Sequence, residues 1–209
     1  MIACLTRTKF YLHIGQVKVW MVGSSIIKRA TVAARLRTGG LNLNLHDTSI
    51  WWQGYGGMNL LDLVPKLKTL KKVNYESPDF LVVHCGANDI GRTPLLSLIK
   101  LLQSTVLEIQ QLFPDVRLVW SSLLPRFNWR YSNNIQAMES ARTRINREAI
   151  KFITSRGGAF IKHPQLEAKP VHLYHSDGVH LSQLGNEIFL NNLQGAIEGF
   201  QSSQANTGP

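Results

Sequence analysis

The stretch Phe80-Leu81-Val82-Val83-His84, followed by Cys85-Gly86-Ala87-Asn88-Asp89, decides the fold of this chain. A continuous apolar run without polar alternation suits a strand that is buried on both faces of a sheet. A polar, glycine-containing loop directly after such a strand is typical of a parallel sheet, in which the carboxyl ends of the strands carry the functional groups. The stretch therefore predicts an α/β protein.

Strand-like and helical segments alternate about five times along the rest of the chain. The further strand-like segments are Val17–Val22, Thr48–Trp52, Val116–Ser121 and Ala159–Ile161. The helical segments are Ser25–Arg37, the segment after Asn59 with Leu60, Leu61, Val64, Leu67 and Leu70 on one face, Thr93–Phe113, Ile135–Ser155 and Ser182–Phe200. This alternation predicts a single three-layer α/β/α domain with a doubly wound, mostly parallel, five-stranded sheet.

Length and composition fit one globular domain. The chain has 209 residues, of which 44% are hydrophobic and 17% charged. We expect an N-terminal extension over residues 1–16, the α/β domain over 17–200 and a disordered tail over 201–209. No segment approaches the roughly 18 consecutive apolar residues of a membrane span. Residues 1–16 lack the apolar core and cleavage site of a signal peptide, so we expect an intracellular protein, cytoplasmic or nuclear.

The two cysteines, Cys4 and Cys85, have no metal-binding or redox spacing. Cys85 follows a strand and is expected to be a buried thiol. This usage favours a reducing compartment.

Polar residues with catalytic potential follow several of the predicted strands. Ser25 follows the first strand, Gly56-Gly57 follows the second and Asn88 follows the third. Asp177 and His180 lie three positions apart in the loop before the last helix. Because a parallel sheet brings such loops to one edge, we expect these residues to form one site. A nucleophilic serine needs an imidazole base, a carboxylate that orients the imidazole, and N–H donors for the developing oxyanion.

Each of these features also has a simpler interpretation. Ser24 or Ser25 could only cap the first helix, Gly56-Gly57 could only form a turn, and Asn88-Asp89 could be a turn with a helix cap. Asp177 and His180 could lie in an ordinary surface loop, or could bind zinc together with His172 and His175. The aromatic residues Trp51, Trp52, Phe127, Trp129 and Tyr131 could line a pocket for the acyl or leaving group; core packing is favoured for Trp51, and a pocket or lid for Trp129 and Tyr131.

The blocks resemble those of the SGNH hydrolases, also called the GDSL-like esterases and lipases. Gly86-Ala87-Asn88-Asp89 is similar to the family's Gly-x-Asn-Asp block, and Asp177-Gly178-Val179-His180 to its Asp-x-x-His block. The resemblance covers about Val17 to Phe200 and implies a flavodoxin-like SGNH fold. It implies Ser25 as nucleophile, His180 as base and Asp177 as orienting acid, with Ser25, Gly57 and Asn88 as the oxyanion hole, and it implies no metal or cofactor.

The first block departs from the family, which usually has Gly-Asp-Ser where this chain has Gly23-Ser24-Ser25. The family's Asp braces the nucleophile loop, so its loss puts the rate in question, and the adjacent serines leave Ser24 as an alternative nucleophile. A narrower resemblance links Val19–Ser25 and Val83–Gly91 to the SGNH-type domains of vertebrate retrotransposons.

The chain is strongly basic, with a formal net charge of +10. The cationic residues gather on three predicted helices, as Lys28, Arg29, Arg35 and Arg37; Lys66, Lys68, Lys71 and Lys72; and Arg142, Arg144, Arg147 and Lys151. A nucleic-acid partner is one interpretation of these clusters, and a solvated basic surface is the other.

Two functions follow from these features. The first is a serine esterase, either a deacetylase or a short-acyl ester hydrolase, with a small ester or acetylated substrate. The alternative is a weakly active or inactive module that binds nucleic acid or protein as part of a retrotransposon protein. The sequence indicates no oligomeric state.

Overall fold

The computed structural model describes residues 16–74 and 76–205. Its five strands form one sheet in the order β2-β1-β3-β4-β5. Every neighbouring pair of strands is parallel. The strands are β1 (Val17–Gly23), β2 (Thr48–Gly54), β3 (Phe80–His84), β4 (Arg117–Ser121) and β5 (Ala159–Ile161). This order is the flavodoxin-like arrangement of a doubly wound sheet. The predicted fold class is therefore confirmed.

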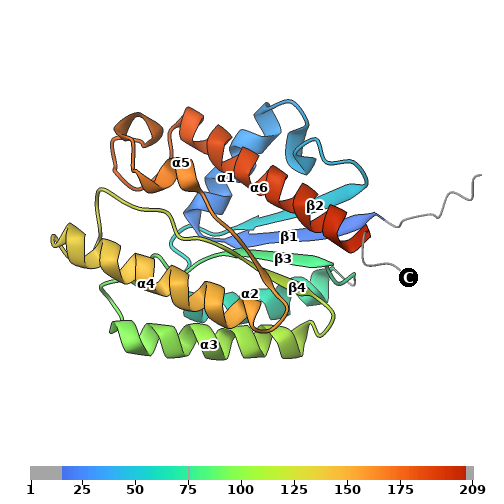
Figure 1. Cartoon of the computed structure of the whole chain (residues 1–209), viewed down its shortest axis with the longest axis horizontal. Helices are drawn as coiled ribbons and strands as arrows, with labels where there is room; N and C mark the ends of the chain where they lie inside the picture. The colour runs from blue at the N-terminus through green and yellow to red at the C-terminus, as the bar shows by residue number, and fades with distance from the viewer. Residues whose placement is uncertain (1–15, 75, 206–209) are drawn as a thin grey trace, which may run out of the picture.

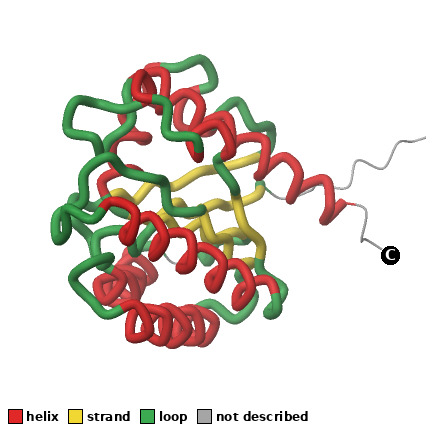
Figure 2. Tube along the Cα trace, turned by 60° about the vertical axis from the view of Figure 1, so that its left-hand side comes forward, coloured by secondary structure: helices red, strands yellow, loops and turns green. Residues whose placement is uncertain are grey.

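Helices cover both faces of the sheet and make three layers (Figures 1 and 2). The helices are α1 (Ser25–Leu36), α2 (Leu60–Val73), α3 (Leu95–Leu112), α4 (Ile135–Thr154), α5 (Pro164–Glu167) and α6 (Gln183–Ala205). Helices α1, α5 and α6 lie on one face, and α2, α3 and α4 lie on the other. The short α5 and the 3₁₀ turns η1 (Gly40–Asn42) and η2 (Val171–Leu173) were not expected, since segments of this length carry no periodic apolar pattern.

Strand β3 is buried along its whole length, as its apolar sequence predicts. Leu81 and Val83 contribute to the core under α2, α3 and α4, whereas Phe80 and Val82 contribute to the core under α1 and α6. The alternation of side chains between the two faces explains why the strand needs apolar residues at successive positions. Cys85, directly after the strand, is a buried free thiol whose pKa is raised by burial.

Two sequence expectations about helices were wrong, one about α2 and one about α6. In α2, Leu61 was expected on the buried face but is 68% exposed, and Leu63 is buried in its place. Leu60, Leu63 and Val64 follow the helical spacing of three and four positions, whereas Leu61 is turned by about 100° from Leu60.

Helix α6 does not end at Phe200 but continues to Ala205. Phe200 stacks on Phe80 with 5.8 Å between ring centroids, and the Gln201 side-chain amide donates to Thr48 Oγ1 at 2.8 Å. These contacts hold the helix against the sheet at Phe200 and Gln201, and residues 201–205 continue it. Residues 206–209 and most of the expected N-terminal extension, residues 1–15, lie outside the described residues, as does Cys4.

Arg142 does not belong to the basic surface on which we placed it. Its side chain is 6% exposed and forms ion pairs with Glu139, at 2.8 Å, and Glu167, at 3.0 Å. Burial lowers the pKa of Arg142, but the hydrogen bonds and charges of the two glutamates raise it above its usual value. The cluster available to a polyanion on α4 is therefore Arg144, Arg147 and Lys151.

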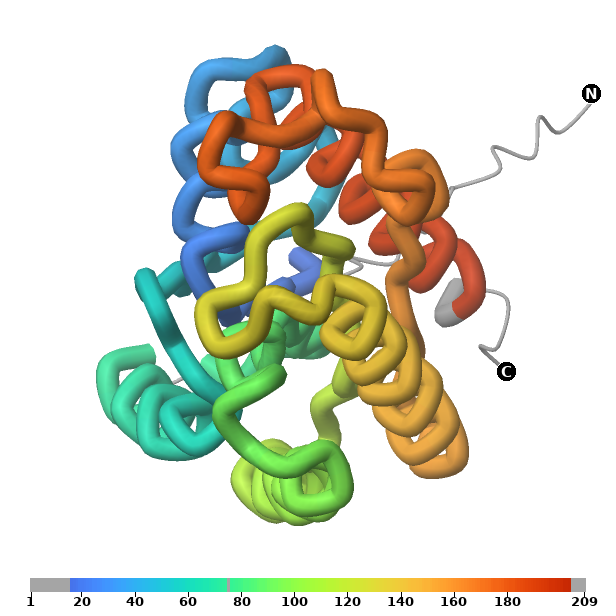
Figure 3. The backbone as a smooth tube through the Cα atoms, turned by 90° about the vertical axis from the view of Figure 1, so that its left-hand side faces the viewer, coloured from blue at the N-terminus to red at the C-terminus, as the bar shows by residue number. Residues whose placement is uncertain are grey.

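Loops that follow the strands gather at the carboxyl edge of the sheet. Figure 3 looks onto this edge: the yellow segment after β4 lies between the green segment after β3 and the red-orange segment before α6. Within the described part of the chain, no helix has the length and apolar character needed to cross a bilayer.

Candidate active site

The turn between β1 and α1 presents Ser25 at the carboxyl edge. A Cβ on Gly23 would lie 2.5 Å from both the His84 carbonyl oxygen and Ile27 Cγ1, so the close approach of β3 and α1 requires glycine there. The Ser24 N–H donates to the His84 carbonyl at 3.1 Å and fixes the turn to β3. Ser25 is then the first residue of α1, with its side chain partly exposed.

Ser25, His180 and Asp177 form one chain of hydrogen bonds. His180 Nε2 lies 2.9 Å from Ser25 Oγ, and His180 Nδ1 lies 2.6 Å from Asp177 Oδ2. An ionised carboxylate can only accept, so the proton of the neutral imidazole is at Nδ1 and Nε2 accepts from the serine hydroxyl. This arrangement can remove the proton from Ser25 as its oxygen attacks an electrophile.

The loop that carries Asp177 and His180 is organised by the Asp177 carboxylate itself. Asp177 Oδ1 accepts the N–H groups of Val179 and His180, each at 2.9 Å. Partial burial raises the pKa of Asp177, but the hydrogen bonds from the backbone and ring of His180 and from Val179 outweigh it. The net effect holds the pKa well below its usual range. Asp177 is therefore ionised at neutral pH.

The segment after β4 braces this loop from outside. Gly178 has a φ of +68°, and a Cβ there would lie 2.7 Å from Asn128 Nδ2. The Asn128 side-chain amide donates to the Asp177 carbonyl at 2.8 Å, and the Phe127 N–H donates to the Gly178 carbonyl at the same distance. Gly178 is thus the residue that lets the two loops pack closely.

A cavity of about 470 Å³ lies beside Ser25 and His180. Gly56, Gly57 and Asn88 line it, together with Trp129 and Tyr131. The Asn88 side-chain amide donates one hydrogen bond to the Met58 carbonyl at 3.0 Å, and an amide of this kind has a second N–H. Gly57 and Asn88, which the sequence assigns to the oxyanion hole, therefore line the same cavity as Ser25.

The structure separates several of the alternative interpretations. Ser24 is 2% exposed and occupies the cap position of α1 without a side-chain capping bond, whereas Ser25 reaches the imidazole. Asp89 does act as a cap, because its Oδ2 accepts the Leu60 N–H at the start of α2 at 3.0 Å, while its neighbour Asn88 lines the cavity. Burial raises the pKa of Asp89.

The zinc set is not assembled. Among residues 16–74 and 76–205, no three His, Cys, Asp or Glu side chains gather as metal ligands would. Asp177 instead contacts His180, and His180 contacts Ser25.

The aromatic residues divide between core and cavity. Trp51 is half-buried and packs edge-on against the core residue Trp20 with 4.8 Å between centroids. Trp52 is buried, and its indole N–H donates to the Leu41 carbonyl. Phe127 packs edge-on against Tyr174. Trp129 and Tyr131 are the members of this set that line the cavity.

The family model of the GDSL-like lipases and acylhydrolases matches residues 23–188, which is most of the chain. The chain belongs to this family. The match begins at the Gly23-Ser24-Ser25 turn and extends into α6, so it includes each of the segments that meet at the cavity.

Several solved structures share the fold at low sequence identity. A GDSL-like lipase from Bacteroides thetaiotaomicron superposes with a TM-score of 0.68 at 16% identity, covering 88% of this chain and 89% of that one. A family 3 carbohydrate esterase from Clostridium thermocellum gives 0.67 at 17% identity, covering 89% and 98%. An acetyl xylan esterase gives 0.64 at 18% identity, covering 87% and 100%. No curated protein sequence matches the chain.

Sequence reasoning missed Arg126, which also lines the cavity. Both of its Nη atoms donate to Asn88 Oδ1, each at 3.3 Å, and its guanidinium carbon lies 5.1 Å from the centroid of the Trp129 ring. The segment after β4 has no periodic pattern, and Arg126 does not belong to the basic clusters on helices. Its adjacency to Trp129 in a polar, aromatic loop was the only available signal.

Proposed function

We propose that the chain is a serine esterase that hydrolyses acetyl or other short-acyl esters with Ser25 as the nucleophile. The observation that carries the proposal is the unbroken hydrogen-bond chain from Ser25 through His180 to Asp177, at the edge of a cavity. Membership of the GDSL-like acylhydrolase family supports the reaction class.

The proposed reaction has two halves. Ser25 Oγ attacks the ester carbonyl while His180 Nε2 takes its proton, and Asp177 stabilises the imidazolium that forms. The imidazolium then protonates the leaving alcohol, and an acyl-enzyme remains. In the second half His180 removes a proton from water, the hydroxide attacks the acyl carbon, and the proton returns to Ser25.

The oxyanion of both tetrahedral intermediates is assigned to three donors. These are the N–H of Ser25, the N–H of Gly57 and the second N–H of the Asn88 amide. Gly57 has a φ of +73° and lines the cavity with Asn88, which supports a turn that directs backbone donors toward the serine. The proposed mechanism uses no metal or cofactor.

A small substrate fits the dimensions of the site. A cavity of about 470 Å³ is at the lower end of the volumes that hold small ligands. Two of the structural neighbours are named as a carbohydrate esterase and an acetyl xylan esterase, which supports an acetyl or other short-acyl ester as the substrate. We further propose that the chain is part of a retrotransposon protein. The resemblance of Val19–Ser25 and Val83–Gly91 to the SGNH-type domains of vertebrate retrotransposons supports this origin.

A panel of 4-nitrophenyl esters of increasing acyl length tests this function. Wild type should hydrolyse the acetyl and other short esters fastest, and Ser25→Ala should lose nearly all of that activity. Ser24→Ala serves as the matched control, since Ser24 is buried and takes no part in the proton relay. Full turnover by Ser25→Ala, or loss of turnover only in Ser24→Ala, would exclude Ser25 as the nucleophile.

A further inference from the structure

Arg126 places a buried positive charge in the cavity without a carboxylate partner. The residue is 7% exposed, and its guanidinium contacts the Asn88 amide oxygen and the Trp129 ring. None of the ion pairs among residues 16–74 and 76–205 includes Arg126. A buried charge without an ion-pair partner destabilises a fold, so its presence beside a candidate nucleophile points to a ligand that supplies a paired opposite charge.

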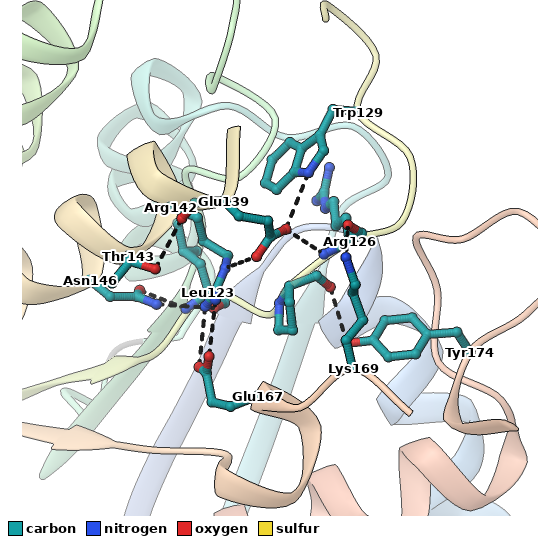
Figure 4. A network of polar contacts seen from close by, with 11 residues as sticks. Leu123, Arg126, Trp129, Glu139, Arg142, Thr143, Asn146, Glu167, Lys169 and Tyr174 are labelled. Carbon is teal, nitrogen blue, oxygen red and sulfur yellow. Dashed lines mark hydrogen bonds and ion pairs between the residues drawn. The ribbon is translucent and has the colours of Figure 1, made fainter. Parts of the chain in front are cut away.

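The nearest acid is engaged with other groups. Figure 4 shows Glu139 between Arg126, Trp129 and Arg142. Glu139 Oε1 accepts the Arg126 backbone N–H at 2.9 Å and the Trp129 indole N–H at 3.2 Å, and Oε2 accepts from Arg142 Nε at 2.8 Å. Glu139 therefore fixes the backbone of Arg126 and the indole beside its guanidinium.

A second contact fixes the backbone of Arg126 at its carbonyl group. Lys169 Nζ donates to the Arg126 carbonyl at 3.2 Å. With its backbone held at both polar groups and its guanidinium against an indole, Arg126 is ordered before any ligand binds, which lowers the entropy cost of binding. Burial lowers the pKa of Arg126 to about 10 and the nearby Glu139 opposes that shift, so the guanidinium remains charged at neutral pH.

The rest of the cavity is also positive. Arg92 and Arg130 line it with exposed side chains. Asp177 is the one carboxylate among the described residues that line it, and both of its oxygens accept hydrogen bonds from the His180 loop. The cavity therefore attracts anions and repels cations.

We propose that the substrate of this site is an ester that carries an anionic group, a carboxylate or a phosphate, and that Arg126 binds this group. The inference rests on the proposed esterase function and names its substrate class. A guanidinium matches the paired oxygens of both anions, and it has N–H groups beyond those used on Asn88. Because Arg126 contacts the Asn88 amide, the anion site lies close to the reacting carbonyl, while Arg92 and Arg130 attract the substrate at the cavity mouth.

Ester pairs of similar size and shape, one member anionic and the other neutral, test the proposal. For an anion in the alcohol part, 4-acetoxybenzoate is compared with 4-acetoxybenzamide, and 4-acetoxyphenyl phosphate distinguishes phosphate from carboxylate. For an anion in the acyl part, mono-4-nitrophenyl adipate is compared with the corresponding terminal amide. In at least one pair, we expect kcat/KM for the anionic member to exceed that for the neutral member by about tenfold or more. A factor of this size is what one hydrogen bond to a charged group contributes. The advantage should shrink at high salt.

Variants assign the preference to the arginines. Arg126→Gln should reduce the ratio of anionic to neutral kcat/KM to about one, and this ratio cancels any general loss from a displaced Asn88. The double variant Arg92→Gln/Arg130→Gln changes exposed side chains, so it should fold, and it should lower the ratio several-fold and flatten its salt dependence. Arg144→Gln, an exposed arginine on α4, is the charge-matched control and should leave the ratio unchanged.

The outcomes separate this inference from the proposed function. Equal kcat/KM for both members of every pair in wild type, with Ser25-dependent hydrolysis intact, overturns the anion preference alone. A wild-type preference that Arg126→Gln does not reduce overturns the assignment of the anion to Arg126, whatever the double variant does. If no ester is hydrolysed, the proposed function fails. Calorimetric binding of 4-hydroxybenzoate against 4-hydroxybenzamide then tests the anion site directly, and equal affinities overturn it.

Discussion

Replacing Asp177 by Asn should reverse the tautomer of His180. In the native loop, Oδ1 of Asp177 accepts two backbone N–H groups and Oδ2 accepts the imidazole Nδ1–H. An Asn side chain keeps the two backbone bonds only if its single oxygen occupies the Oδ1 position. Its NH₂ group then faces Nδ1 and can be accommodated only when Nδ1 carries no proton.

The consequence falls on the serine. With its proton moved to Nε2, the imidazole donates toward Ser25 Oγ and cannot accept the proton of the hydroxyl. We therefore expect Asp177→Asn to lower kcat by about 10⁴-fold, which is the loss seen when a triad carboxylate becomes an amide. That factor corresponds to about 5.5 kcal/mol in activation free energy. The Asp177 side chain is 42% exposed, but solvent screening does not restore the lost acceptor at Nε2.

The assay is hydrolysis of 4-nitrophenyl acetate at neutral pH, with Asp115→Asn as the control. Asp115 is an exposed carboxylate outside the cavity, so its replacement changes the net charge equally. Thermal unfolding of both variants establishes that they are folded. If Asp177→Asn remains within tenfold of wild type, the tautomer argument is refuted, and Asp177 then has a structural role in its loop.

Three further predictions concern separate parts of the molecule. Asn88→Ala should lower kcat by about 10²–10³-fold with a smaller effect on KM, as for loss of one oxyanion donor; an unchanged kcat would remove Asn88 from the oxyanion hole. Burial and the charge of Arg126 lower the pKa of His84 to about 3 despite its contact with Ser121. Burial and the charge of His84 likewise lower the pKa of His163. Below about pH 6.5 the unfolded chain therefore binds more protons than the folded chain. Stability should therefore fall on acidification, by about 2 kcal/mol from His84 alone between about pH 7 and about pH 5, and urea unfolding with no loss over that range would contradict it. If the basic residues of α2 and α4 bind nucleic acid, RNA affinity should fall steeply with salt and weaken when Lys66–Lys72 and the exposed Arg144–Lys151 cations are neutralised, with ester hydrolysis intact; no binding at low salt would end this hypothesis.

Local sequence was sufficient for the fold and for the placement of the main candidate residues. The apolar run Phe80–His84 is a local signal, and the strand–helix alternation around it limits the topology to a few arrangements. Ser25, Asp177 and His180 are each placed by their position next to a strand or helix, and parallel strands bring such positions to one edge. Topology therefore brings these residues to one edge, and the local contacts of their loops complete the hydrogen-bond chain.

Features that depend on contacts distant in sequence could not be predicted in this way. Arg126 contacts Glu139 of α4 and Asn88 of the loop after β3 as well as Trp129 of its own loop, and no spacing rule links Arg126 to the first two. Arg142 could not be placed from the sequence for the same reason. A charged residue on a helix is expected at the surface, but Arg142 forms ion pairs with two glutamates in the interior. Charge patterns in sequence report composition, and burial is decided by packing.

Covalent labelling with a neutral alkyl fluorophosphonate tests the central claim most directly, because only a serine activated by a base reacts at an appreciable rate. Peptide mass spectrometry of the labelled protein should place one adduct on Ser25, and His180→Ala should abolish labelling while leaving the protein folded. An adduct on Ser24, or a folded wild-type protein that is not labelled at all, would contradict the account.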